Sequence, residues 1–194
     1  MYQNLWKRLF DILFSLIALL AFSPVLIILA LAIKLDSSGP LLFIQARLGR
    51  NGHIFHILKF RTMFDVPRIV GREIFTGDAA LTRIGCFLRR AKLDELPQFL
   101  NILWGDMSVV GPRPCVPQHQ EDFNADGWAR RKVRPGLTGL AQILGNTYLS
   151  WPERWLYDRQ YVESVSFVLD LKILFTTVAI VLFGEDKFIK KPHA

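Results

Sequence analysis

The sequence predicts an irregular α/β protein, mostly helical with short strands, that is attached to a membrane through its first residues. Three observations support this prediction. A long apolar segment interrupted by a proline lies near the N-terminus, short apolar runs alternate with glycine- and proline-rich turns after it, and the net charge is +7. Hydrophobic residues make up 51% of the 194 residues although 21% are charged. Such a composition indicates one membrane element, residues 1–36, beside one compact domain, residues 37–194.

The apolar segment from Leu9 to Ile33 contains a single charged side chain, Asp11. It is longer than the roughly 20 residues that a helix needs to cross a bilayer. A secretory signal peptide fits poorly, because the apolar run is too long and no small-residue cleavage site follows it. A straight transmembrane helix remains an open alternative.

A re-entrant helix explains two further features of this segment. Ser23-Pro24 lies in its middle, where proline removes a helical hydrogen bond and the serine hydroxyl can bind a freed backbone group. Both flanks are basic, and basic residues prefer the cytoplasmic side of a membrane. The flanking cations are Lys7 and Arg8 before the segment, and Lys34, Arg47, Arg50, Lys59 and Arg61 after it. We therefore expect a helix–break–helix hairpin over residues 1–36 whose two ends lie on the cytoplasmic face.

The rest of the chain predicts short elements separated by turns. Asn51-Gly52 is typical of a hairpin tip and Gly105 of a helix end, and residues 82–90 form a basic amphipathic stretch that predicts a helix. The expected elements are an apolar run at 41–45, a strand at 54–60, a surface loop or short helical pieces at 65–80, helices at 82–90, 94–104 and 151–163, an extended piece at 107–110 and a turn-rich loop at 134–139.

The apolar stretch from Val165 to Phe183 is not expected to enter the bilayer as the segment from Leu9 to Ile33 does. It carries Asp170 and Lys172, and charged side chains inside a bilayer are costly. We expect an amphipathic helix lying in the membrane interface, with the aromatic residues Trp151, Trp155 and Tyr157 nearby.

Several classes of protein are disfavoured by the composition. The basic pI of about 9.7 fits an anionic membrane face or phosphorylated substrates, but no zinc spacing or RNA-recognition motif is present, so we expect no nucleic acid partner. Cys86 and Cys115 form no CxxC pair, which predicts a domain facing the reducing cytosol. The four histidines show no HExxH-like arrangement and predict no histidine metal site.

The adjacent carboxylates Asp94 and Glu95 are the main candidates for chemistry. Neighbouring helical residues do not face each other, so the two side chains cannot easily share a proton. They can instead divide the work, with one carboxylate directed at a phosphorus atom and the other holding a metal ion. A helix start favours such anions. The alternative is that both residues only cap the helix, and the pair taken alone favours that alternative.

Cations surround the pair in the sequence. Arg113 lies between two prolines, and this stiff backbone suits a bidentate contact with phosphate. For Lys59, Arg61 and Arg113, a phosphate contact and a solvated surface role are equally supported by the residues. For Lys92, Arg130 and Arg131 we favour a surface or lipid-headgroup contact.

Five ordered motifs extend this picture over nearly the whole chain. They are Phe43-Ile44-Gln45-Ala46-Arg47-Leu48-Gly49-Arg50-Asn51-Gly52, Lys59-Phe60-Arg61-Thr62-Met63, Leu93-Asp94-Glu95-Leu96-Pro97-Gln98, Gly105-Asp106-Met107-Ser108 with Gly111-Pro112-Arg113-Pro114, and Arg134-Pro135-Gly136-Leu137-Thr138-Gly139-Leu140-Ala141-Gln142. Together they resemble the bacterial sugar transferase family of monotopic phosphoglycosyl transferases, in its minimal form without additional transmembrane helices.

The resemblance implies an activity and a location. Such an enzyme has a re-entrant membrane helix, depends on Mg²⁺ and works on the cytoplasmic face of the bacterial inner membrane. Its aspartate attacks the β-phosphorus of a UDP-sugar, UMP leaves, and the covalent sugar phosphate passes to a polyprenyl phosphate, usually undecaprenyl phosphate. This ping-pong reaction initiates glycoconjugate biosynthesis. Phosphoryl transfer of this kind requires positioning and charge neutralisation, which cations supply.

The motif positions imply roles for individual residues. Asp94 corresponds to the nucleophile and Glu95 to the Mg²⁺ ligand. Contacts with the phosphates or the uridine are implied for Lys59, Arg61, Arg113, Arg134 and Gln142.

Two other functions stay open at this stage. One is the same overall reaction by direct displacement, with Asp94 as a general base. The other is a non-catalytic module that binds anionic lipids through its basic surface. The sequence identifies neither the sugar nor the pathway, and it allows a homo-oligomer. We expect the sugar to be selected by residues 64–80 or 143–160.

Overall fold

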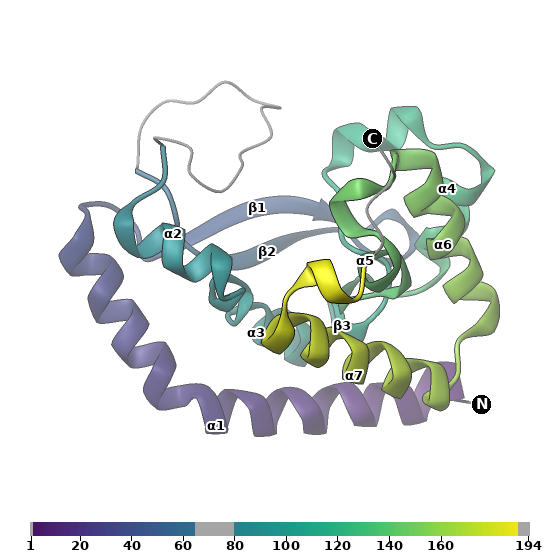
Figure 1. The fold of residues 1–194 in the computed structure, drawn as a ribbon. Coiled ribbons are helices and arrows are strands. Elements are labelled where there is room, and N and C mark those ends of the chain that lie inside the picture. The colour runs from purple at the N-terminus through teal and green to yellow at the C-terminus, as the bar shows by residue number, and fades with distance from the viewer. Residues whose placement is uncertain (1, 65–79, 190–194) are drawn as a thin grey trace.

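The computed structural model describes residues 2–64 and 80–189, and it confirms a mostly helical chain with short strands (Figure 1). The helices are α1 (Lys7–Asp36), α2 (Arg83–Arg90), α3 (Gln98–Trp104), α4 (Ala125–Ala129), α5 (Leu140–Leu144), α6 (Trp151–Ser164) and α7 (Phe167–Phe183). The strands are β1 (Leu42–Leu48), β2 (Ile54–Phe60), β3 (Ser108–Val110) and β4 (Gly136–Thr138). The single-turn elements are η1 (Tyr2–Trp6), η2 (Arg50–Gly52), η3 (Leu93–Glu95), η4 (Pro117–Asp122), η5 (Arg130–Lys132), η6 (Asn146–Tyr148) and η7 (Glu185–Lys187). The loop predicted at 65–80 lies outside the described residues except for its last one.

Helix α1 contains Pro24 and is nevertheless continuous over 30 residues. The Ser23 hydroxyl donates a hydrogen bond to the Leu20 carbonyl at 2.8 Å. This carbonyl is the one that loses its helical partner, because Pro24 has no N–H to offer it. Figure 1 shows α1 running beneath the domain and then bending upward. The predicted break is therefore a bend in one helix, and the predicted role of the serine hydroxyl is confirmed.

The first half of α1 is held to the domain by buried charges. The Lys7 ammonium lies 2.6 Å from the carboxylate of Asp170 on α7. Asp11 accepts hydrogen bonds from the Ser108 hydroxyl and the Val109 N–H, both at 2.9 Å. These contacts join the start of the chain to β3 and α7.

The second end of α1 is held by the same domain. The Asp36 carboxylate accepts a hydrogen bond from the N–H of Ile84 at 3.1 Å. The buried guanidinium of Arg61 donates to the carbonyls of Ser37 and Ser38, both at 2.6 Å. Both ends of α1 are thus fastened to one domain. By length and composition α1 is able to cross a membrane, and its re-entrant topology stays a prediction.

The β1–β2 hairpin has the predicted turn. The strands pair antiparallel from Leu42↔Phe60 to Leu48↔Ile54, and Asn51 and Gly52 adopt left-handed φ angles of 56° and 82° at the tip, as Asn-Gly turns require.

A single side chain docks α3 against this hairpin. The buried amide of Asn101 on α3 accepts a hydrogen bond from the Leu58 N–H at 3.0 Å and donates one to the His56 carbonyl at 2.8 Å. Because α3 follows the carboxylate pair in the chain, this contact brings the pair close to the end of β2.

The second sheet explains two glycines of the sequence motifs. Strands β3 and β4 are parallel, with Ser108 opposite Gly136 and Val110 opposite Thr138. A Cβ atom added at Gly136 would lie 2.1 Å from the backbone nitrogen of Gly111. Only glycine allows the two motif loops to approach so closely.

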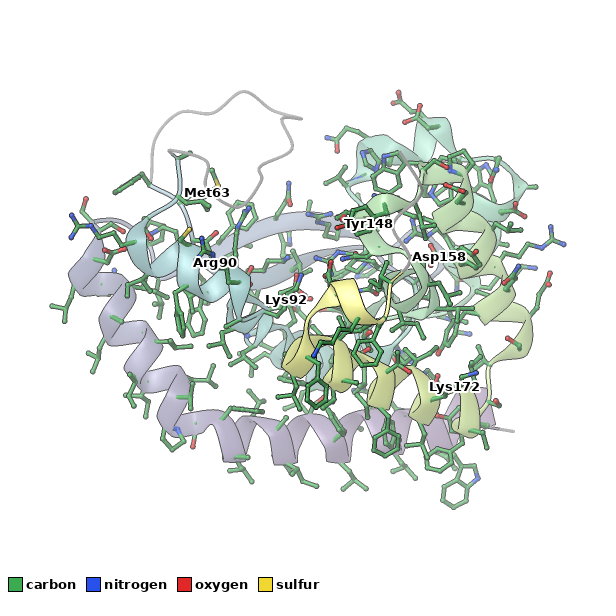
Figure 2. The ribbon with its side chains drawn as sticks, in the orientation of Figure 1. Met63, Arg90, Lys92, Tyr148, Asp158 and Lys172 are labelled. Atoms are coloured by element: carbon green, nitrogen blue, oxygen red, sulfur yellow. The ribbon has the colours of Figure 1, made fainter. Side chains whose placement is uncertain are left out.

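An apolar underside is formed by α7 and the first half of α1. Val168, Phe175 and Leu182 of α7 and Ile17 and Leu20 of α1 are each at least 65% exposed. In Figure 2, side chains of carbon alone project downward from these two helices. Asp170 is completely buried on the inner face of α7, so α7 is amphipathic in the predicted sense, and its location in the membrane interface stays a prediction.

One expectation about the aromatic residues is wrong. Trp155 is buried, and its ring lies 5.4 Å from that of Phe123. It packs inside the lobe formed by α4 and α6 because its helix is covered by that neighbouring segment, and it does not anchor the domain at an interface.

Candidate active site

The carboxylates of Asp94 and Glu95 lie in the 3₁₀ turn η3, directly before α3. The prediction of one helix over residues 94–104 is wrong at its start. Pro97 has no N–H to continue the hydrogen-bond ladder, so a tight turn precedes α3 and Pro97 becomes its N-cap. Gly105 ends α3 in a left-handed conformation, as predicted.

Neither carboxylate caps a helix. The N-cap of α3 is Pro97 and that of η3 is Lys92, and no side chain bonds to the backbone at either position. The capping alternative raised by the sequence therefore does not explain the pair.

Glu95 is clamped by two cations. Its Oε1 lies 2.6 Å from both the Lys59 ammonium and the Arg113 guanidinium, and its Oε2 lies 3.4 Å from Arg113. Burial opposes the ionisation of Glu95, but Arg113 and Lys59 outweigh it and hold the pKa of this carboxyl well below its usual range. Glu95 is thus a fixed anion that orients both cations.

Asp94 differs from its neighbour in its surroundings. It is only 8% exposed, and its carboxylate makes no hydrogen bond or ion pair with any residue in the described ranges. Burial raises the pKa of Asp94 and the charge of Glu95 raises it further, while Lys59, Arg89 and Arg113 oppose the shift. A poorly solvated carboxylate without a partner, set among cations, has the properties of a nucleophile directed at a phosphate.

Arg113 is positioned by the two motif loops and by a buried ion pair. The Gly136 N–H donates to the Pro112 carbonyl at 2.9 Å. The Arg130 guanidinium donates to the Arg113 carbonyl and lies 3.2 Å from Asp158 on α6. The loop that carries Arg113 is therefore supported from two sides.

The surface role expected for Arg130 is wrong. Arg130 and Asp158 are 7% and 3% exposed. Burial raises the pKa of Asp158 to about 6, and Arg130 opposes the shift. Figure 2 labels Asp158 on α6, in the lobe to the right. The partner of Arg130, Asp158, lies 28 residues further along the chain. Nothing in the sequence indicated that these two residues pair.

A profile of the bacterial sugar transferase family matches residues 2–184. The chain belongs to this family. It is 42% identical to the undecaprenyl-phosphate glucose phosphotransferase of Komagataeibacter xylinus over 96% of this chain and 38% of that protein. It is also 42% identical to the UDP-glucose:undecaprenyl-phosphate glucose-1-phosphate transferase of Caulobacter vibrioides over 95% of this chain and 73% of that protein. The exopolysaccharide production protein ExoY of Rhizobium meliloti is 38% identical over 94% and 88%, respectively.

The chain spans about two-fifths of the length of some relatives: it covers 38% of the Komagataeibacter protein, and 39% and 40% of the UDP-glucose:undecaprenyl-phosphate glucose-1-phosphate transferases of Klebsiella pneumoniae and Escherichia coli. The match with the family profile nevertheless includes α1 and the whole of the candidate site.

Two further arginines of this sugar transferase lie near the carboxylates. Arg47 donates to the Pro114 carbonyl at 3.0 Å, and burial, together with Arg113, lowers its pKa to about 10. Arg89 on α2 donates to the Thr62 hydroxyl at 3.1 Å. In the sequence, Arg89 is one of the cations just before the carboxylate pair, and Arg47 belongs to the first motif. The sequence alone assigned no role to either residue.

Three of the predicted phosphate or uridine contacts have other partners in the described part of the chain. Arg61 binds the end of α1, as described above. Arg134 donates through Nε to the Gly105 carbonyl at 2.8 Å, and Gln142 donates to the Leu137 carbonyl at 3.1 Å. Lys59 and Arg113 are brought to the carboxylates, and Arg61, Arg134 and Gln142 are not. Their roles toward a nucleotide stay predictions.

The carboxylates fit a magnesium ion that is shared with a substrate. Among residues 2–64 and 80–189, no group of three or more acidic, histidine or cysteine side chains forms a cage. Mg²⁺ is commonly held by one or two carboxylates, with water and substrate phosphates completing its shell. Asp94 and Glu95 supply hard oxygen ligands of this kind.

Proposed function

We propose that this sugar transferase moves a sugar 1-phosphate from a UDP-sugar to undecaprenyl phosphate and releases UMP. The single observation that carries the proposal is the contrast within the pair. Glu95 is paired with both Lys59 and Arg113 at 2.6 Å, whereas Asp94 is buried and without a partner among the described residues. The names of the relatives make UDP-glucose the first donor to test.

In the first half-reaction, a carboxylate oxygen of Asp94 attacks the β-phosphorus of the donor. The bond between this phosphorus and the oxygen bridging to UMP breaks, and UMP leaves with the electron pair. Lys59 and Arg113 lie beside the attacking carboxylate and neutralise the negative charge on the phosphoryl oxygens. Asp94 then carries the sugar phosphate as an acyl phosphate.

In the second half-reaction, a phosphate oxygen of undecaprenyl phosphate attacks the same phosphorus. The bond to Asp94 breaks, the carboxylate is regenerated, and a sugar diphosphate lipid is formed. Covalent catalysis suits this pair of substrates because the soluble donor and the membrane-bound acceptor need not occupy the site together.

Mg²⁺ would be held by Glu95, with Asp94 beside it, and when bound it supplies additional positive charge for the diphosphate. Lys59 and Arg113 contact Glu95 in this structure. When the metal ion occupies Glu95, both side chains would be able to turn toward the phosphates. Their charges then remain within the site throughout the reaction.

The attachment of α1 supports a re-entrant topology. Lys7 forms an ion pair with Asp170, and Asp36 accepts a hydrogen bond from the backbone N–H of Ile84. Both ends of the helix therefore contact the same domain. A domain on one side of the membrane can hold both ends only if the helix returns to that side. We place the domain on the cytoplasmic face of the bacterial inner membrane, which the basic residues on both flanks of the apolar segment favour, and we propose that the product initiates exopolysaccharide or related glycan assembly.

The proposal is tested by measuring UMP release from a panel of UDP-sugars by the purified full chain. With UDP-glucose and no acceptor, a covalent mechanism gives a burst of about one UMP per enzyme, and undecaprenyl phosphate converts the burst into turnover. Direct displacement gives no burst without the acceptor. A non-catalytic lipid-binding module gives no UMP under either condition.

A further inference from the structure

A second cationic site lies at the tip of the β1–β2 hairpin. A cavity of about 210 Å³ opens there, lined by Gly49, Arg50, Asn51 and His53 of the tip together with Gly105, Asp106 and Arg134. None of Lys59, Asp94, Glu95 and Arg113 lines it. The cavity is therefore distinct from the site of the proposed transfer.

The charges around this cavity are unbalanced. Arg134 is held through Nε by Gly105, which leaves its two outer amines without a partner in the described part of the chain. Arg8 donates to two carbonyls at the end of α3, at 2.6 and 2.7 Å, and its guanidinium approaches Gly105. Burial lowers the pKa of Arg134, and the charges of Arg8 and Arg50 lower it further.

No carboxylate among the described residues forms an ion pair with these three arginines, and Asp106 is the single acidic side chain that lines the cavity. Arg50 and Arg134 line the cavity and Arg8 lies beside it at Gly105, and neighbouring guanidinium groups repel one another unless an anion lies between them. Arginine forks match the geometry of a phosphate group. The cavity therefore has the chemistry of a phosphate site.

The phosphates of the proposed reaction do not account for this site. The reacting phosphate of the donor and that of the acceptor must each reach Asp94, which precedes α3, whereas Gly105 and Asp106 follow it. The seven residues of α3 separate the two places by about 10 Å, at 1.5 Å per residue. A phosphate in the cavity is too far from Asp94 to react.

The surroundings of the cavity connect it to the apolar underside. Arg8 lies in the first turn of α1, beside Leu5 and Trp6, which are 62% and 55% exposed. Trp104, which is 64% exposed, directly precedes Gly105. Exposed tryptophans next to arginines are typical of the level of the lipid headgroups.

We propose that this cavity binds the phosphodiester of an anionic membrane phospholipid as a non-reacting ligand. The inference rests on the proposed attachment of α1 to the membrane. The excess of arginines favours a headgroup with a net negative charge, such as phosphatidylglycerol, over phosphatidylcholine, whose ammonium would meet the same arginines. The bound lipid fixes the hairpin tip and the end of α3 at the membrane surface.

Native mass spectrometry of the full chain in detergent counts bound lipids directly. We expect the wild type to retain phosphatidylglycerol in preference to phosphatidylcholine. Arg50→Glu should weaken phosphatidylglycerol binding about tenfold, because it removes one charge-assisted contact and adds a like charge. Arg83→Glu is the matched control, since Arg83 is exposed and lies on α2, at the opposite end of the hairpin from its tip (Figure 1). It should bind as the wild type does.

Three results would overturn the proposal. Equal losses in both variants would show a general charge effect. Displacement of the lipid by an equal concentration of inorganic phosphate would show that a free phosphate, and not a lipid, is the ligand. A loss of the UMP burst in folded Arg50→Glu without lipid would assign the cavity to the donor. Counting bound lipids requires no turnover. If the proposed reaction fails while phosphatidylglycerol is still bound, only the proposed function is wrong, and the lipid site stands.

Discussion

Arg130 forms a buried ion pair with Asp158, with 3.2 Å between Nε and Oδ2. The same guanidinium donates to the carbonyl of Arg113, whose own guanidinium clamps Glu95. The Arg130–Asp158 pair contains none of the reacting groups. It nevertheless supports Arg113, one of the two cations that hold Glu95, the candidate metal ligand.

The first prediction separates the effect of the Arg130–Asp158 pair on stability from its effect on catalysis. Arg130→Met should lower the free energy of unfolding by about 3–5 kcal/mol, because it leaves a buried carboxylate without its cation. The double variant Arg130→Met with Asp158→Leu should recover most of this loss, since an apolar pair replaces the ion pair. Its kcat should still fall roughly tenfold, because the Arg113 loop is no longer fixed. Denaturation and UMP release measure the two effects.

KM for the UDP-sugar should change little in the double variant, because Arg130 supports the site without contacting the substrate. A folded double variant with the kcat of the wild type would show that Arg113 needs no such support.

The second prediction concerns the nucleophile. Asp94→Asn should lower turnover by roughly a thousandfold or more, because an amide cannot attack phosphorus. Its free energy of unfolding should stay level or rise, since burial disfavours the charged form of Asp94. Mass spectrometry of the wild type with donor alone should show a sugar phosphate adduct that Asp94→Asn lacks. Asp122→Asn, an exposed residue of η4, is the control and should be fully active. Substantial turnover by Asp94→Asn is incompatible with a covalent mechanism.

Glu95→Gln tests the other carboxylate. The change weakens a metal ligand and releases Lys59 and Arg113, so we expect turnover to fall severely. We also expect lower stability, because Lys59 loses its carboxylate partner. A Gln variant with the metal dependence and turnover of the wild type would remove Glu95 from the proposed metal site.

The third prediction is the requirement for a divalent metal ion. Excess EDTA should abolish UMP release, and Mg²⁺ should restore it best, because carboxylate and phosphate oxygens are hard ligands. The melting temperature should not change with EDTA, since the described residues provide no structural metal cage. Full activity in excess EDTA contradicts the prediction.

Much of the fold around the site could be predicted from local signals. Asn51-Gly52 marks the hairpin tip and Gly105 the end of α3, because the backbone at these positions is left-handed. The pairing of Arg130 with Asp158 and the binding of Arg61 to the end of α1 could not be predicted. Both depend on segments that meet only in the folded chain, and a charged side chain carries no local mark of its distant partner.

The fourth prediction is topological. A cysteine at position 3, in a variant without Cys86 and Cys115, should react with an impermeant maleimide from the cytoplasmic side alone. A separate variant that keeps Cys86 reports the side of the domain. Replacing Ser23 by Leu and Pro24 by Ala should send part of the N-termini to the far side, because a helix without the bend is long enough to span, although Lys7 and Arg8 resist. Labelling of the unmutated N-terminus from the periplasmic side alone would show that α1 simply spans.

The ion pair between Lys7 and Asp170 also governs the order in which the protein is completed. Its members are separated by 163 positions in the sequence, so Lys7 leaves the ribosome long before its partner exists. Until α7 has been synthesised, the ammonium of Lys7 has to remain solvated, and the first half of α1 cannot dock in its final place. A nascent chain that stops before α7 therefore lacks the partner that fixes the first half of α1, and the synthesis of α7 is what allows this half to dock.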